Sequence, residues 1–329
     1  AVLIESDAHF NYIPHYIHLN PMTLLNKQGN KRGPTCSVEN PYTPWYNHCM
    51  KTSKSPNKIA LVAYATAKQS LPAYRHEFSP RKFTQPQLAT CLVLKEFFTT
   101  DYRGIEEILK DSSDLRKILE LREVPHYTTL QKASKRLTKK KMLDKLMKEI
   151  LTIAIKAKIM KKNVKLSAID GTGFESRHVS GYFVKRKAKC TGEDQKTTYS
   201  RYPKVGIVVD CDTHMVFSGV PSRGPYPDIV HYEKAINEAE KNIHMKVLTA
   251  DAGYDSEKSH TFAREEHNIR TIIPPKIGRR TNKLPSGKWR KIMATRFNKK
   301  LYGQRWQVET VNSMVKRNLG SALRARNYW

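Results

Sequence analysis

The sequence predicts an α/β protein in which a helical region precedes a domain of mixed strands and helices. Three observations predict this class. The length of 329 residues fits about two domains. From residue 85 to 162 apolar residues recur at helical spacing, and after residue 163 short apolar runs typical of strands take over. We therefore expect an irregular N-terminal segment over 1–84, a helical region with a basic linker over 85–162, and an α/β domain over 163–329.

Residues 1–84 are expected to be mostly loop with short helices, because prolines recur there among basic stretches. The segment AVLIESDAHF has no basic start and no apolar run typical of a signal peptide. The chain's five cysteines contain no CxxC pair, which favours reduced cysteines over a disulfide framework. Cys36, His48 and Cys49 could hold a metal, but their spacing matches no known zinc finger.

Three helical stretches follow, over 85–98, over 102–124 with an interruption at 111–113, and over 124–140. The third should be capped by Thr128 or Thr129 after a proline. Its exposed face is expected to carry Gln131, Lys132, Ser134, Lys135 and Arg136. Short helices before a basic, polar one resemble a helix-turn-helix, which makes Lys132, Lys135 and Arg136 candidate DNA contacts. The alternative is a three-helix scaffold with a solvated basic face.

A lysine-rich amphipathic helix is expected within 139–165, with Leu143, Leu146, Met147, Ile150, Leu151 and Ile155 as its buried stripe. Beyond it, strands are expected to end on Asp170 and Asp251, around a hairpin over 202–224 that turns at 210–213. A helix over 232–241 and a strand over 269–276 complete the core. A basic excursion over 276–300 then leads to a helix over 301–319 that Gly320 should stop.

The chain carries 59 Lys and Arg against 30 Asp and Glu, a formal net charge of +29. Ordinary domains keep a net charge of roughly 2–8, because self-repulsion destabilises the compact state. A polyanion is therefore the expected partner, and a metabolic enzyme of small neutral substrates is disfavoured. The longest apolar runs fall far short of the roughly 20 residues that span a membrane, so no membrane partner is expected.

Two aspartates follow apolar strands directly, in the segments AID170-GTGF and TAD251-AGYDS. Ligands commonly bind at strand ends of α/β sheets. Taken singly, either aspartate is adequately explained as part of a turn. Together, in a strongly basic protein, Asp170 and Asp251 are candidate ligands of a shared site.

The helix over 301–319 offers a third carboxylate. At about 100° per residue, Tyr302, Arg305, Glu309 and Lys316 fall within a sector of roughly 60°, beside an aliphatic face that could pack on a sheet. The alternative is ordinary amphipathicity with an Arg305–Glu309 ion pair. Three carboxylates with nearby cations suit phosphodiester transfer, in which Mg²⁺ ions about 3.5–4 Å apart activate the attacking oxygen and stabilise the leaving one.

These residues resemble the DDE transposases of bacterial and archaeal insertion sequences, which have a ribonuclease H-like catalytic domain. The spacing Tyr302-x2-Arg305-x3-Glu309-x6-Lys316 is similar to the family's signature around its catalytic glutamate. The segments DGTGF at 170–174 and DAGYDS at 251–256 resemble its two aspartate motifs. The resemblance covers about residues 165–320.

The resemblance implies that Asp170, Asp251 and Glu309 bind two Mg²⁺ or Mn²⁺ ions, and that Tyr302, Arg305 and Lys316 contact DNA. It implies hydrolysis at the element ends and attack of the freed 3′-hydroxyl on target DNA. Double-stranded DNA (terminal inverted repeats and target) would be the partner, with a homodimer assembled on it at the nucleoid of a prokaryotic cell. Four aspartates are rival ligands, ranked below the three named: Asp210, Asp212, Asp228 and Asp255.

Two features depart from that family. Residues 8–23, HFNYIPHYIHLNPMTL, resemble a fragment of the REP-associated tyrosine transposases, without their His-x-His metal motif, and suggest an inactive remnant containing Tyr16. Family members usually continue further beyond the glutamate helix. The alternatives are therefore a truncated or catalytically inactive DNA-binding protein, and a nuclease of the same fold that only hydrolyses.

Overall fold

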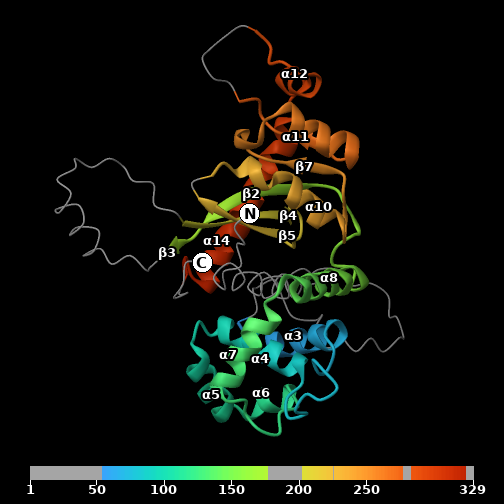
Figure 1. Ribbon diagram of the computed structural model, residues 1–329. Coiled ribbons are helices and arrows are strands. Elements are labelled where there is room, and N and C mark those ends of the chain that lie inside the picture. The colour runs from blue at the N-terminus through green and yellow to red at the C-terminus, as the bar shows by residue number, and fades with distance from the viewer. Residues whose placement is uncertain (1–53, 177–201, 225, 277–282, 324–329) are drawn as a thin grey trace, which may run out of the picture. The chain divides into compact units, whose positions relative to one another are not determined.

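The computed structural model describes residues 54–176, 202–224, 226–276 and 283–323 (Figure 1). They divide into two compact units, a helical one that ends at Lys162 and an α/β one that begins at Asn163. The segment 8–23 and the set Cys36, His48 and Cys49 lie outside the described residues. Within these ranges, no helix is both long and apolar enough to cross a membrane.

The helical unit is built on short amphipathic helices around an aliphatic core. Leu94, Ile105, Leu109 and Leu130 are fully buried in it. A capping box starts one helix, where Thr84 and Gln87 exchange side chain–backbone hydrogen bonds. In order, the helices are α3 (Pro56–Ser70), α4 (Gln85–Phe97), α5 (Tyr102–Asp111), α6 (Ser113–Ile118), α7 (Tyr127–Leu137) and α8 (Lys140–Lys156).

Residues 1–84 are expected to be mostly loop with short helices, and their described part contains the longer helix α3. Ser55 caps this helix and Pro56 occupies its first turn, where proline costs no hydrogen bond. Ile59, Ala63 and Tyr64 are buried. The proline at this position therefore marks a helix start and not a loop.

Two details of α7 also differ from expectation. His126 caps the helix, its Nδ1 accepting from the backbone N–H of Thr128 at 3.4 Å, in place of a threonine cap. Ser134 is buried and Arg136 half-buried, because both border the packing stripe. Burial lowers the pKa of Arg136. Lys132 and Lys135 are exposed as predicted.

A mixed five-stranded sheet in the order β5-β4-β2-β7-β8 forms the centre of the α/β unit. Its strands are β2 (Ser167–Gly173), β4 (Tyr202–Asp210), β5 (Val216–Gly224), β7 (Val247–Thr249) and β8 (Arg270–Ile272). The first three pair antiparallel, and β7 and β8 continue parallel to β2. The β4–β5 hairpin turns over 211–215, close to the predicted position. This mixed sheet confirms the α/β fold class and is consistent with a ribonuclease H-like fold.

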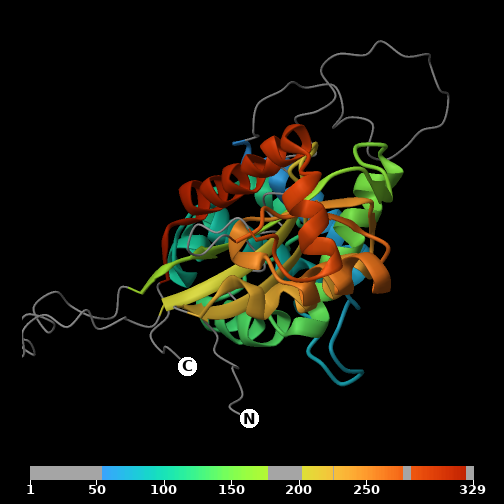
Figure 2. The ribbon, with the colours of Figure 1, turned by 90° about the horizontal axis from the view of Figure 1, so that it is seen from above.

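Helices cover both faces of this sheet. Figure 2 shows α14 (Trp306–Leu319) and α10 (Tyr232–Glu240) on opposite sides of it. Val308, Val311 and Val315 form the buried face of α14, as the periodicity predicts. On α10, Ala235 and Ile236 are fully buried.

Shorter elements complete the unit. They are β1 (Asn163–Val164), which pairs with β6 (His244–Met245), β3 (Glu175–Ser176), which pairs with β9 (Ala322–Leu323), and α11 (Glu257–Thr261). The expected basic excursion contains two helices, α12 (Lys288–Thr295) and α13 (Lys299–Tyr302). A 3₁₀ turn, η5 (Gly303–Arg305), interrupts the expected single helix before α14. Gly320, at a φ of 95° that favours glycine, ends α14 as predicted.

Candidate active site

Asp170 lies in the central strand of the sheet. The strand β2 continues to Gly173, so the prediction that it ends on Asp170 is wrong, because β2 extends along the long antiparallel partner β4. On its other side β2 pairs with β7 only at Ser167–Leu248 and Ala168–Thr249. If this parallel register is continued by two residues beyond Ala168 and Thr249, it reaches Asp170 and Asp251. The two aspartates therefore lie at the same level of the sheet, Asp170 within β2 and Asp251 just past β7.

The strand β7 ends at Thr249, two residues before the predicted end, and Asp251 caps a short 3₁₀ turn, η3 (Ala252–Tyr254). Its Oδ1 accepts the backbone N–H of Gly253 at 2.8 Å. That bond fixes the carboxylate at the strand end while leaving its other oxygen available. The segment DAG thus positions an acceptor at the edge where parallel strands end.

The helix α14 brings its polar side to β2. Asn312 donates from Nδ2 to Asp170 Oδ2 at 2.9 Å. One turn earlier on the same side of the helix is Glu309, with a side chain that is 53% exposed and forms an ion pair with Arg305. The positive charge of Arg305 also lowers the pKa of Asp170. Asp170, Glu309 and Arg305 therefore belong to one polar cluster.

Burial raises the pKa of Asp170 from 3.8 to about 6. The nearby carboxylates of Asp251 and Asp228 raise it further, while the backbone N–H of Gly171 and the charge of Arg305 oppose the rise. Both raising influences penalise the ionised form. A bound cation would offset them, so the environment of Asp170 suits a metal ligand.

Asp228, one of the four rivals, also lies close to β2. It is the first residue of a 3₁₀ turn, η2 (Asp228–His231), and forms an ion pair with Lys204. A Cβ atom on Gly171 would collide with its Oδ1. Because neighbouring strand residues face opposite sides of a sheet, Asp228 approaches β2 from the side opposite Asp170.

Tyr254 and His231 form a buried layer beneath these carboxylates. His231 Nε2 and the Tyr254 hydroxyl are 3.1 Å apart. Burial lowers the pKa of His231 to about 4. Burial also raises the pKa of Tyr254, and the negative charges of Asp228, Asp170 and Asp251 add to the rise. All three aspartates thus lie near one phenol.

The other rival aspartates are placed elsewhere. Asp210 is opposite Ser167 in the β2–β4 ladder, three residues from Asp170, and its Oδ1 accepts the backbone N–H of Asp212 in the hairpin turn. Asp255 is fully buried in an ion pair with Arg290. Asp210 and Asp255 thus have structural partners away from Asp170, and Asp212 lies in the hairpin turn.

The remaining candidate residues are distributed over three helices. Lys316, half-buried on α14, has its Nζ 5.7 Å from the ring centre of Phe174, just past β2. Tyr302, half-buried at the end of α13, packs on Phe297 with ring centres 5.1 Å apart. The candidates Lys132, Lys135 and Arg136 lie on α7 in the helical unit.

The three carboxylates suit a metal ion in their chemistry, because oxygen ligands select hard cations such as Mg²⁺ or Mn²⁺. Among the described residues, no group of three His, Cys, Asp or Glu side chains lies close enough to hold an ion. Glu309 pairs with Arg305, so its carboxylate would have to turn away from that cation to join Asp170 and Asp251 as a ligand.

Asn312 is a site residue that our sequence analysis missed. It follows Glu309 by three residues and Arg305 by seven, the spacing of one helix face. The same helical periodicity that selected Lys316 therefore includes it. We overlooked it because a search for carboxylates and cations leaves out amides.

A comparison with protein families gives one match. The family described as "Transposase DDE domain" matches residues 165–329. The match covers the whole five-stranded sheet, α14 and all three carboxylates of the candidate site. No curated protein matches the chain.

Proposed function

The chain belongs to the transposase DDE family, which gives it a role in DNA transposition, and from this premise we propose that it cuts the ends of a mobile element and joins them to target DNA. The proposed reaction has two steps. Water attacks a phosphodiester at each element end, which releases a 3′-hydroxyl. That hydroxyl then attacks a phosphodiester of the target, so the total number of such bonds is conserved in the second step.

The observation that supports this proposal most is the packing around Asp170: the register of β2 with β7 puts Asp170 and Asp251 at one level, and the bond from Asn312 attaches the helix of Glu309 to Asp170. The three residues come from parts of the chain that are far apart in sequence. All three lie in the region that matches the family, residues 165–329. A chance grouping of turn aspartates would not require a helix to donate to one of them.

The side chains take distinct roles in the proposed site. Asp170, Asp251 and Glu309 would hold Mg²⁺ or Mn²⁺, two ions in our proposal, which supply charge stabilisation at the attacking and leaving oxygens. Asn312 orients the Asp170 carboxylate through its 2.9 Å hydrogen bond. Arg305 forms an ion pair with Glu309 and would move to a DNA phosphate when that carboxylate turns to a metal.

Further residues would hold the DNA itself. Lys316 and Tyr302 are proposed to contact phosphates of the transposon end, next to the glutamate. Lys132, Lys135 and Arg136 on α7 are proposed to read or anchor the terminal repeat. We propose assembly of two copies on paired ends, acting at the nucleoid of a prokaryotic cell. The high net charge supports DNA as the partner.

Product analysis tests the proposal. Purified protein is incubated with Mg²⁺, a labelled duplex carrying the inverted repeats that flank its gene, and a supercoiled plasmid. The expected products are cut ends and labelled plasmid. The Asp170→Ala and Glu309→Ala variants should give neither, whereas Asp212→Ala, which removes an exposed acid of the hairpin turn, should give both.

Two alternatives predict other products. A nuclease that only hydrolyses would give cut ends without labelled plasmid. A catalytically inactive, transposase-derived DNA-binding protein would retain the duplex and give no product with any divalent ion. Activity that survives Asp170→Ala would contradict the assignment of the carboxylates.

A further inference from the structure

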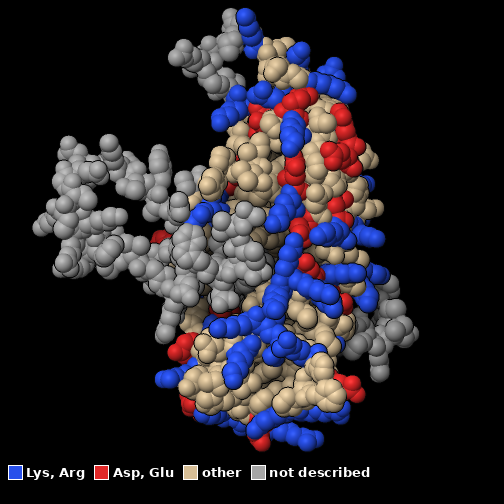
Figure 3. Space-filling model, viewed as in Figure 1, with Lys and Arg blue, Asp and Glu red and all other residues tan. Residues whose placement is uncertain are grey.

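A long stretch before the glutamate contains no acid. Between Glu266 and Glu309 the chain has twelve Lys and Arg residues and no Asp or Glu. Its described part forms α12 and α13 on the α/β unit. Figure 3 shows Lys and Arg side chains gathered at the α12 end of the molecule. A local charge of this size requires either a solvated surface or a polyanionic partner.

The helix α12 has two different faces. At 100° per residue, Trp289, Arg290 and Met293 lie on one side of the helix, and Lys288 and Lys291 begin on the other. The Nζ of Lys288 lies 4.4 Å from the ring centre of Trp289, so this lysine borders the first side. Met293 is buried, while both lysines are exposed. Among the residues that the structure describes, no carboxylate forms an ion pair with either lysine. Arg296, Lys299 and Lys300, all exposed, extend the positive surface toward α13.

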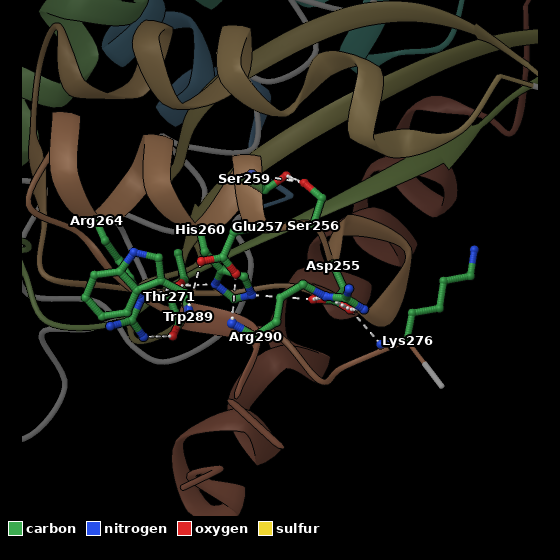
Figure 4. Close-up of polar contacts among 10 residues, drawn as sticks. All are labelled: Asp255, Ser256, Glu257, Ser259, His260, Arg264, Thr271, Lys276, Trp289 and Arg290. Atoms are coloured by element: carbon green, nitrogen blue, oxygen red, sulfur yellow. Dashed lines mark hydrogen bonds and ion pairs between the residues drawn. The ribbon is translucent and has the colours of Figure 1, made fainter. Parts of the chain in front are cut away.

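The first face is attached to the unit through Asp255. This carboxylate is fully buried and accepts from Arg290 Nη2 at 2.7 Å and Nε at 2.9 Å (Figure 4). It also accepts the backbone N–H of Lys276 at 2.7 Å. A two-pronged guanidinium contact fixes orientation as well as distance. Asp255 is four residues after Asp251, so α12 is anchored to the loop that carries a proposed metal ligand.

Glu257 provides a second attachment. Its carboxylate accepts the backbone N–H groups of Trp289 at 2.9 Å and Arg290 at 3.1 Å, at the start of α12. An acid at this end also interacts favourably with the helix dipole. Gly287 precedes the helix at a φ of 98°, and a Cβ there would collide with the Glu257 carboxylate. The chain thus needs glycine to bring α12 onto Glu257.

Trp289 packs against α11 and the segment after it. Its Nε1 donates to Glu265 Oε1 at 2.9 Å, and the guanidinium of Arg264 lies 4.5 Å from its ring centre. Figure 4 shows these residues and Arg290 on the same docked side. The acids near α12 are therefore engaged by its docked face and by its N-terminus, which leaves the opposite face positive.

We propose that the lysine face of α12, extended by the cations of α13, binds the phosphates of duplex DNA, and that Asp255 and Glu257 are positioning residues that hold this face beside the Asp251 loop. The inference rests on the proposed function for the identity of the polyanion. It adds a DNA-binding surface outside the Tyr302, Arg305 and Lys316 set. A merely solvated surface would not need such attachment.

Salt titration of DNA binding tests the surface. The affinity for a fluorescent duplex of about three helical turns is measured by anisotropy in EDTA, from roughly 50 to 200 mM salt. The double variant Lys288→Gln/Lys291→Gln is compared with Lys234→Gln/Lys241→Gln, which removes one exposed lysine of α10 and the exposed lysine that follows this helix. Both lower the net charge equally, so a difference reports a local contact.

Two lost phosphate contacts should reduce the slope of log affinity against log salt by about 1.8 and weaken binding by at least about tenfold near 100 mM salt. The α10 control should change affinity less than about twofold. If the wild type binds duplex DNA and both double variants have its affinity and its salt slope, the inference is overturned. If the wild type itself fails to bind duplex DNA, the proposed function fails instead.

The attachment is tested by Glu257→Gln and Asp255→Asn. With the lysines intact, loss of positioning should still weaken DNA binding severalfold and speed tryptic cleavage near Lys288 and Lys291, while the Mg²⁺-dependent rise in melting temperature is retained. Glu257→Gln keeps an acceptor oxygen, so it provides the test of positioning if the Asp255→Asn protein does not fold. A folded Glu257→Gln protein with wild-type DNA affinity and wild-type proteolysis would overturn the positioning role.

Discussion

Replacing Asp170 by Asn should stabilise the protein while abolishing its chemistry. The folded state raises the pKa of this carboxyl from 3.8 to about 6, which means that ionised Asp170 is more costly in the folded than in the unfolded chain. At 1.36 kcal/mol per pKa unit the difference amounts to about 3 kcal/mol. Asparagine is similar in shape, carries no charge and can still accept from Asn312, although more weakly. We expect a net gain of about 2–3 kcal/mol near neutral pH.

The sign of the pH dependence follows from the same shift. When folding raises the pKa of an acid, its ionised form destabilises the folded state. For Asp170 this destabilisation is absent below about pH 3.8 and complete above about pH 6. The advantage of Asp170→Asn should therefore shrink to about 0.5 kcal/mol at pH 4 and grow as the pH rises. Urea unfolding of both proteins in EDTA, followed by circular dichroism between pH 4 and 7.5, measures it.

Addition of Mg²⁺ should reverse the order of stability. A cation that binds only the folded wild-type site stabilises it by mass action, whereas the variant lacks one ligand. The reasoning is refuted if Asp170→Asn is no more stable than the wild type at neutral pH in EDTA. It is also refuted if the stability difference is the same at pH 4 and pH 7.

Further substitutions test the surroundings of Asp170. Gly171→Ala should cost about 1–3 kcal/mol in urea unfolding, because its Cβ meets Asp228. Acidification from pH 7 to 5 should lower the free energy of unfolding by about 2 kcal/mol through His231, because burial lowers its pKa from 6.5 to about 4 and protonation favours the unfolded state. A His231→Gln protein that loses as much stability as the wild type would contradict this. Asn312→Ala should weaken Mn²⁺ binding, measured calorimetrically, by about 10–100-fold, and unchanged affinity would exclude its orienting role.

Periodicity predicts the helices and the core of the α/β unit well. Val308, Val311 and Val315 repeat at helical spacing and are buried against the sheet. The apolar run before Asp251 forms β7, and the run over 202–224 forms the β4–β5 hairpin. In each case the residue pattern decides which face is buried, and this is a local property of the chain.

Tertiary pairing was harder to foresee. The extent of β2 beyond Asp170 depends on β4, a strand more than thirty residues away, and no local pattern records that partner. The same holds for α12, whose first turn is satisfied by Glu257 from another helix. A segment that has basic residues and glycine but no strong apolar period looks irregular until its distant acids are known.

The same distinction between local pattern and tertiary packing holds for the candidate site. Motif spacing predicts Asp170, Asp251 and Glu309 as the metal ligands. The hydrogen bond from Asn312 to Asp170 and the close approach of Asp228 to Gly171 are seen only in the packing, although Asn312 shares its helix face with the predicted residues. Whether the three carboxylates act together stays a prediction until their chemistry is measured.

Single-turnover cleavage of a terminal-repeat duplex in Mg²⁺ tests that joint action most directly. Asp170→Asn, Asp251→Asn and Glu309→Gln are compared singly and combined. If the three residues hold the catalytic metal as a unit, each single change should slow cleavage by at least about a thousandfold, and the triple variant should be little slower than any single one. Effects that are small, or that multiply from one variant to the next, would contradict the account.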